Sequence, residues 1–66
     1  MWQDANGSLI TCRNKVQVLE ENMQELQQQC QDALDDALLM GCGETYFKNM
    51  LLKMVNNLSP TVKERK

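Results

Sequence analysis

The chain has 66 residues, seven basic and nine acidic side chains, a formal net charge of −2 and no histidine. A monomeric core of this size rarely supplies more than about 3–5 kcal/mol, so a single small domain depends on disulfides, a metal or oligomerisation for its stability. The excess of acid argues against a nucleic-acid-binding surface, and no apolar run reaches the ~18–20 residues of a membrane-spanning helix.

Residues 1–8 are predicted to form a flexible leader. Asn6 and Gly7 make a turn dipeptide, and Ser8 is a candidate N-cap for the helix that follows. Gly7-Ser8 is also typical of a cloning junction, which leaves open whether the leader is native. Trp2, the single tryptophan, is interpreted either as a residue of an added tag or as a docking anchor.

Residues 9–40 carry the clearest pattern of the chain. Apolar residues recur at alternating spacings of three and four over nearly five heptads, as in the seam of a coiled coil. No Pro or Gly interrupts the run, and Gln, Glu, Lys and Arg fill many polar positions, which favours a helix of roughly 50 Å. The predicted dimer seam consists of Leu9, Cys12, Val16, Leu19, Met23, Leu26, Cys30, Ala33, Ala37 and Met40.

The segment 13–31 is typical of a two-stranded coiled coil, because Val at an a position with Leu at d favours parallel dimers. Lys15 at g and Glu20 at the following e would form ion pairs across a parallel, in-register seam, each worth a few tenths of a kcal/mol. No Asn at an a position fixes the register. An antiparallel arrangement therefore stays open, as does a tetramer in place of the homodimer.

The seam narrows towards its C-terminal end. Its members there are Cys30, Ala33 and Ala37, which bury too little area to hold two helices together. Leu34 and Leu38 appear at the same level but outside the a and d positions. Both features indicate that this part of the helix packs against a further helix, because small seam residues let helix backbones come close and the apolar stripe becomes wider.

The residues that follow provide that helix. Gly41-Cys42-Gly43 (residues 41–43) is predicted to reverse the chain, because two glycines in three residues suit a helix C-cap and a turn. Residues 44–58 then show a second apolar helical face, and Ser59-Pro60 ends it before a basic tail, residues 59–66. The packing of the second helix is assigned to Leu34, Leu38, Phe47, Met50, Leu51, Met54, Val55 and Leu58.

The sequence predicts no catalytic, cofactor or metal site. The absence of histidine removes the usual general base, and three cysteines without a C-x-x-C pair fit neither a zinc site nor a disulfide framework. Cys42, between two glycines, is expected to be the most accessible thiol, although the nearby Glu44 disfavours its thiolate. Three free thiols indicate a reducing, intracellular setting, cytoplasmic or nuclear.

The predicted fold is all-α: a long helix that forms a parallel coiled coil, a Gly-rich reversal, and a short second helix that packs back to form a four-helix bundle end. The predicted function is non-enzymatic oligomerisation and protein–protein interaction, with a second copy or another helical protein as partner and neither nucleic acid nor membrane. Such segments are typical of larger cytoskeletal, centrosomal or chromosome-associated coiled-coil proteins. The alternative is a small regulatory protein, of viral or phage type, that places an amphipathic helix in a partner's groove.

Overall fold

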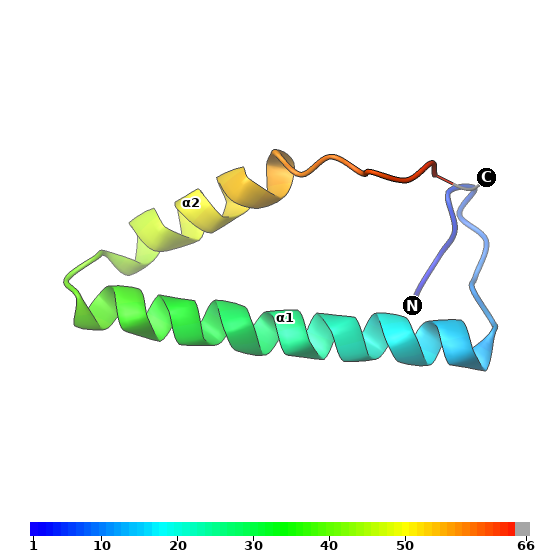
Figure 1. The fold of residues 1–66 in the computed structure, drawn as a ribbon, viewed down its shortest axis with the longest axis horizontal. Coiled ribbons are helices and arrows are strands. Elements are labelled where there is room, and N and C mark those ends of the chain that lie inside the picture. Colours follow the sequence, from blue (N-terminus) through cyan, green and yellow to red (C-terminus); the bar gives the residue numbers. More distant parts are fainter. Residues whose placement is uncertain (65–66) are drawn as a thin grey trace.

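Two α-helices, α1 (Arg13–Leu39) and α2 (Glu44–Asn56), make up the regular structure of the computed structural model (Figure 1). The structure describes residues 1–64, and within them the fold is all-helical, as predicted, with one long and one short helix and no β-strand. The end of the predicted basic tail, residues 65–66, lies outside the described residues. Neither helix combines the length and the apolar character that crossing a membrane would require.

Helix α1 is stabilised along its surface by its own polar side chains. Glutamine amides donate hydrogen bonds to carboxylates one turn ahead, at 2.9 to 3.1 Å, in the pairs Gln17–Glu21, Gln28–Asp32 and Gln31–Asp35. The helix begins at Arg13, with Cys12 at the N-cap position, and not at Leu9 as the heptad pattern predicted. Ser8 is consequently not the N-cap, and Leu9 and Cys12 of the predicted seam precede the helix.

The later start has a local cause, because residues 2–10 fold into a hydrogen-bonded loop where a flexible leader was expected. The Asp4 carboxylate accepts hydrogen bonds from the backbone amides of Asn6 and Ser8, both at 2.9 Å. Short polar side chains commonly turn the chain in this way. Gly7 has a φ of 84°, a backbone conformation that glycine adopts readily. An isolated antiparallel bridge between Gln3 and Leu9 closes the loop, so Leu9 belongs to the loop and α1 begins after it.

The turn after α1 follows the hydrogen-bond pattern of a Schellman motif. The amide of Gly41 donates to the carbonyl of Leu38 at 3.1 Å, and the amide of Cys42 donates to the carbonyl of Ala37 at 2.8 Å. Gly41 lies in the left-handed region with a φ of 93°, which side chains other than glycine adopt only with strain. The motif satisfies carbonyls at the end of α1 and directs the chain back towards its own helix.

Helix α2 begins directly after this turn. Gly43 is its N-cap in an extended conformation, with a φ of −71° and a ψ of 143°, and the amide of Phe47 closes the first turn onto the Gly43 carbonyl at 3.0 Å. Lys48 and Glu44 form an ion pair of 2.9 Å on the exposed surface of this turn. The helix ends at Asn56, two residues before the predicted end at residue 58.

The single chain is elongated and has almost no core. Its principal dimensions are 43 × 22 × 19 Å, and its radius of gyration is 15.4 Å, compared with about 11 Å for a compact domain of this length. Ala37, 7% exposed, is the one buried hydrophobic residue of the described part. The accessible surface is 6223 Å², whereas a compact monomer of 7.6 kDa exposes about 4,300 Å². Folding of one copy therefore leaves much apolar surface uncovered.

Candidate interaction surface

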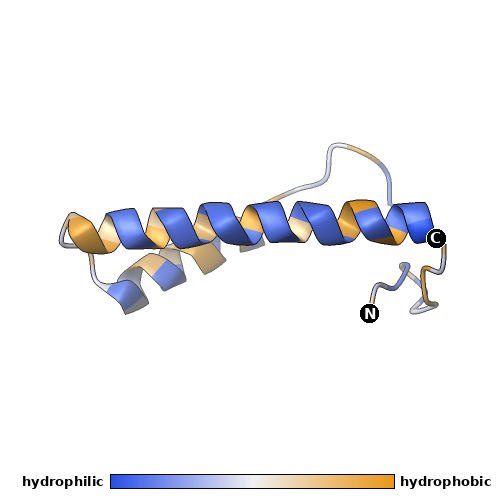
Figure 2. Cartoon of the chain, turned by 90° about the horizontal axis from the view of Figure 1, so that it is seen from below, coloured by the Kyte–Doolittle hydropathy of each residue, from blue (hydrophilic) through white to orange (hydrophobic). Residues whose placement is uncertain are grey.

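The predicted seam is exposed over most of its length in the single chain. Within α1, Val16, Leu19 and Cys30 are half-buried and Ala37 is buried. The remaining seam residues are all exposed: Leu9, Cys12, Met23, Leu26, Ala33 and Met40. The opposite face of α1, which points away from α2, is mainly hydrophilic (Figure 2). The apolar stripe thus lies on the same side of α1 as α2, and the chain itself covers only part of it.

Helix α2 runs back over the C-terminal part of this stripe and diverges from α1 as it leaves the turn (Figure 1). A groove of about 380 Å³ lies between the two helices. The groove is lined by Leu26, Gln29, Cys30 and Ala33 of α1 and by Phe47, Met50, Leu51 and Met54 of α2. One of these eight side chains, Gln29, is polar, so the groove is an apolar surface open to solvent.

Phe47 and Leu51 are the residues of α2 that pack most closely on α1. Both are half-buried, and both also line a smaller depression of about 150 Å³ on the other side of α2, together with Leu34. Of the other residues assigned to this packing, Leu34 is half-buried, whereas Leu38 is 44% exposed. The exposed fractions along α2 are 49% for Met50, 51% for Met54, 50% for Val55 and 70% for the following Leu58.

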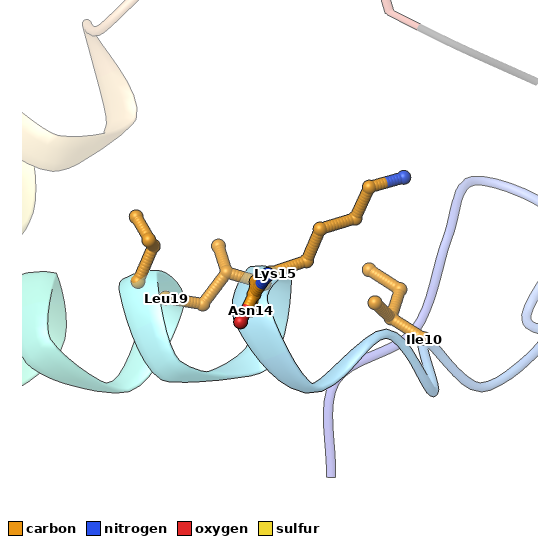
Figure 3. A pocket seen from close by; sticks show the side chains of 5 residues that line it. Ile10, Asn14, Lys15 and Leu19 are labelled. Atoms are coloured by element: carbon orange, nitrogen blue, oxygen red, sulfur yellow. The ribbon is translucent and has the colours of Figure 1, made fainter.

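The N-terminal loop contacts the other end of the same stripe, which the sequence pattern did not predict. The indole N–H of Trp2 donates a hydrogen bond of 2.8 Å to one carboxylate oxygen of Glu20. Trp2 and Val16 line one depression beside the loop, and Ile10 and Leu19 line a second one (Figure 3). Trp2 therefore acts as an anchor of the loop on α1.

The three thiols differ in exposure in an order that the sequence did not predict. Cys12 is exposed, whereas Cys42, expected to be the most accessible, is half-buried like Cys30. The backbone amide of Lys15 lowers the pKa of the Cys12 thiol, and the amide of Asn14 and the charge of Lys15 act in the same direction against desolvation. The Cys12 sulfur nevertheless makes no hydrogen bond that caps the helix. We therefore expect the most reactive of the three thiols at the start of α1.

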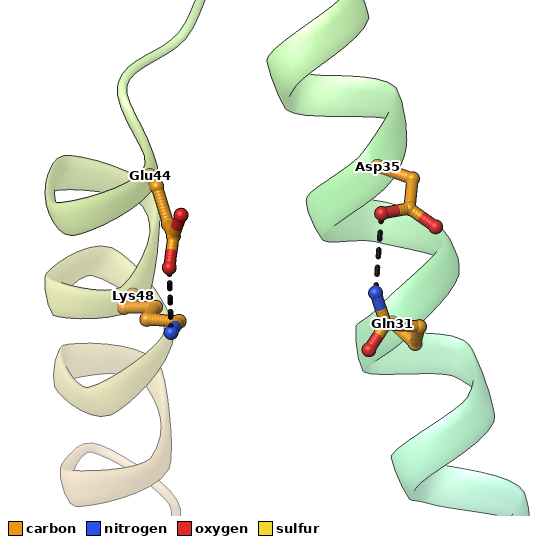
Figure 4. A network of polar contacts seen from close by, with 4 residues as sticks. All are labelled: Gln31, Asp35, Glu44 and Lys48. Atoms are coloured by element: carbon orange, nitrogen blue, oxygen red, sulfur yellow. Dashed lines mark hydrogen bonds and ion pairs between the residues drawn. The ribbon is translucent and has the colours of Figure 1, made fainter.

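The polar contacts of the chain are surface contacts along single helices. Figure 4 shows two of them, the Lys48–Glu44 ion pair on α2 and the hydrogen bond from Gln31 to Asp35 on α1. Lys48, through this hydrogen bond and its charge, lowers the pKa of the Glu44 carboxyl. No group of three or more His, Cys, Asp or Glu side chains within residues 1–64 is arranged to hold a metal ion.

Comparisons of the chain with protein-family models, with curated proteins and with solved structures find no significant match.

Proposed function

We propose that this chain is a non-enzymatic self-association and protein-interaction module that functions as a homodimer. The observation that carries the proposal is the uncovered surface. The single chain exposes roughly 1,900 Å² more than a compact monomer of its mass, while a standard protein interface buries about 800 Å² on each partner. A second copy offers the same apolar stripe, so a symmetric pair would cover both stripes at once.

In the proposed dimer, two α1 helices run parallel and pair along residues 16–26. Val at a and Leu at d favour this arrangement, and Lys15 would approach Glu20 of the partner copy. The hydrogen bond from Trp2 uses one carboxylate oxygen of Glu20, so the other oxygen can accept the Lys15 ammonium. That ammonium extends away from α1 and is available for such a contact (Figure 3).

Towards the turn, the proposed coiled coil widens into a four-helix bundle made of α1 and α2 of both copies. The small seam residues support this proposal, since Ala37 is buried at the point where the chain turns back and Cys30 lies beneath α2. A larger residue at these positions would hold α2 further from α1. Exposed methionines on α2 leave its apolar face only partly covered by its own α1.

Burial within the chain favours this proposal over a regulatory helix that stays free until it meets a partner's groove. Such a helix would carry its anchor residues exposed before binding. Phe47 and Leu51 are instead half-buried against α1 of their own chain.

The experiment that tests the proposal compares two leucines of α1 in thermal unfolding over a hundredfold range of protein concentration. Leu26, on the seam, is 49% exposed, and Leu39, outside the seam, is 87% exposed. Leu26→Ala should cost about 1–2 kcal/mol at each of two sites in the dimer, because roughly half of the side chain remains to be buried. Leu39→Ala is the control and should leave association unchanged.

For the wild type, the unfolding temperature should rise with concentration, since association favours the folded form by mass action. Leu26→Ala should weaken association, so that a given rise in the unfolding temperature requires a higher protein concentration. A wild-type unfolding temperature that is constant across the whole range would contradict self-association. Equal effects of the two substitutions would show that the seam is not the surface involved.

A further inference from the structure

The groove between α1 and α2 is an uncovered apolar surface that both helices share. Its two walls carry different charges. On α1, Gln29 lines the groove, and Glu25, Asp32 and Asp36 share its row along the helix, because the four residues are spaced by four, three and four. The α1 wall therefore has an acidic rim.

The α2 wall has a basic rim instead. Lys53 lies one residue before Met54 and three after Met50, and both methionines line the groove. Over its whole length α1 carries six carboxylates and two basic residues, whereas α2 carries one carboxylate and two lysines. Within residues 1–64 ion pairing is confined to Lys48 and Glu44. Asp32 accepts a hydrogen bond from Gln28 on one carboxylate oxygen, so its other oxygen can accept a lysine of another molecule.

These charges restrict which occupant fits the groove. Two α1 helices placed side by side at this level would bring the acidic row of one close to that of the other, and like charges in contact are unfavourable. An α2 helix placed against the α1 wall brings a lysine to the acidic row and methionines to the apolar groove. The chain itself contains such a helix, and the surface available, roughly 1,900 Å² beyond that of a compact monomer, is sufficient for a standard interface.

We infer that the groove receives helix α2 of a second copy, so that in the dimer each α2 packs between its own α1 and the α1 of the partner, with Lys53 on the acidic row of that helix. This inference rests on the proposed self-association and specifies its interface. A two-fold axis parallel to the helices places each residue at the same position along that axis in both copies. Helix α2 then runs antiparallel to both α1 helices. Lys53 is next to Met54 and Asp32 is next to Ala33 in the sequence, and both of these neighbours line the groove, so we take Asp32 as the carboxylate of the row that Lys53 meets.

A charge-exchange experiment tests the contact between copies. Lys53→Glu alone places two carboxylates at each of the two rim contacts of a homodimer, and Asp32→Lys alone places two ammonium groups there. Each variant should dimerise about tenfold more weakly than the wild type, because two exposed pairs change from attraction to repulsion. Sedimentation equilibrium at low salt measures the dissociation constant, and circular dichroism checks that helicity is unchanged.

An equimolar mixture of the two variants separates contacts between copies from contacts within one chain. In the mixed dimer both rim contacts again join opposite charges, so its dissociation constant should return to the wild-type value. If Lys53 met Asp32 of its own chain instead, each variant would keep like charges in the mixture and no recovery would occur.

A matched pair of substitutions on α2 tests the apolar part of the contact. Met54, in the groove, is 51% exposed, and Leu52, on the outer face of α2, is 60% exposed. Met54→Gln should weaken dimerisation about thirtyfold, since the exposed half of the side chain is buried at two sites in the dimer. Leu52→Gln makes a similar change outside the groove and should leave the dissociation constant within a factor of two.

The outcomes separate this inference from the proposed function. A wild-type chain that remains monomeric at all concentrations overturns both. A wild-type dimer with no recovery in the charge-exchange mixture, or with equal effects of Met54→Gln and Leu52→Gln, overturns the inference and leaves self-association through another surface. Recovery together with selective weakening by Met54→Gln supports the groove as the interface.

Discussion

The reversal between α1 and α2 should depend on Gly41 far more than on Gly43. Gly41 has a φ of 93°, and a Cβ placed there would meet no atom within 4 Å. The cost of Gly41→Ala in the folded turn is therefore the backbone cost alone, about 1–2 kcal/mol. In a continuous helix that bypasses the turn, the same substitution is favourable by about 1 kcal/mol. The two effects add to about 2–3 kcal/mol in favour of the straight helix, or at least thirtyfold in its population.

Gly43 provides the matched control, because it lies in an extended conformation that alanine also adopts, with a φ of −71° and open space around a Cβ. Gly43→Ala should therefore change the free-energy difference between the turn and the straight helix by only about 1 kcal/mol, through helix propensity. A straight helix over residues 13–56 would be about 66 Å long, compared with the present long dimension of 43 Å. Small-angle scattering measures this difference directly.

Gly41→Ala should give a longer particle, whereas Gly43→Ala should give a particle close in length to the wild type. Equal lengthening by both substitutions would show that helix propensity alone controls the turn and that its left-handed residue has no special role. An unchanged length for Gly41→Ala would show that packing of α2 on α1 outweighs the turn, so that the reversal does not depend on the Schellman motif.

Three further predictions concern pairing direction, thiol reactivity and pH. With the native cysteines replaced by serine, Leu19→Cys should give a disulfide-linked dimer on mild oxidation, because parallel helices place this seam position opposite its copy; only monomer on a non-reducing gel would indicate antiparallel pairing. Cys12, exposed and with a lowered pKa, should be alkylated several-fold faster at neutral pH than the two half-buried cysteines; a peptide-mapping time course with equal rates would contradict this. The pKa of Glu44 is lowered in the folded chain, so its ion pair with Lys48 contributes above the ordinary value of 4.5 and is lost as pH falls through the folded value. Helicity should accordingly decrease more on acidification in the wild type than in Glu44→Gln, and identical titrations by circular dichroism would refute the role of this pair.

The helices could be predicted because their signals are local. Two helices were predicted within a few residues of their observed bounds. The signals were the apolar spacing of three and four, the paired glycines and the proline at residue 60. Phe47 and Leu51 were also assigned to packing from periodicity alone, and both are half-buried. Spacing is sufficient here because an amphipathic helix has only one apolar face to pack.

The start of α1 was missed because another local preference competes with the heptads. The Asp4 carboxylate and the left-handed Gly7 form a loop that takes Leu9 out of the helix. The Asn6-Gly7 signal for a turn was recognised, but the loop is anchored by the contact of Trp2 with Glu20, which is 18 residues away. Heptad spacing contains no information about such a contact.

The groove could be anticipated only in outline. The narrow seam at Cys30 and Ala33 indicated that another helix packs there, but the divergence of α2 from α1, which leaves Met50 and Met54 half-exposed, depends on the geometry of the turn. Sequence periodicity predicts which face of a helix is apolar, not how far apart two faces lie.

The measurement that tests self-association most directly is the mass of the chain in solution, by sedimentation equilibrium, across a hundredfold range of concentration. The accessible surface of 6223 Å², roughly 1,900 Å² more than that of a compact monomer of 7.6 kDa, predicts that the mass rises with concentration to twice the monomer value. A mass that stays at 7.6 kDa at every concentration, with helicity unchanged on dilution, would contradict the account.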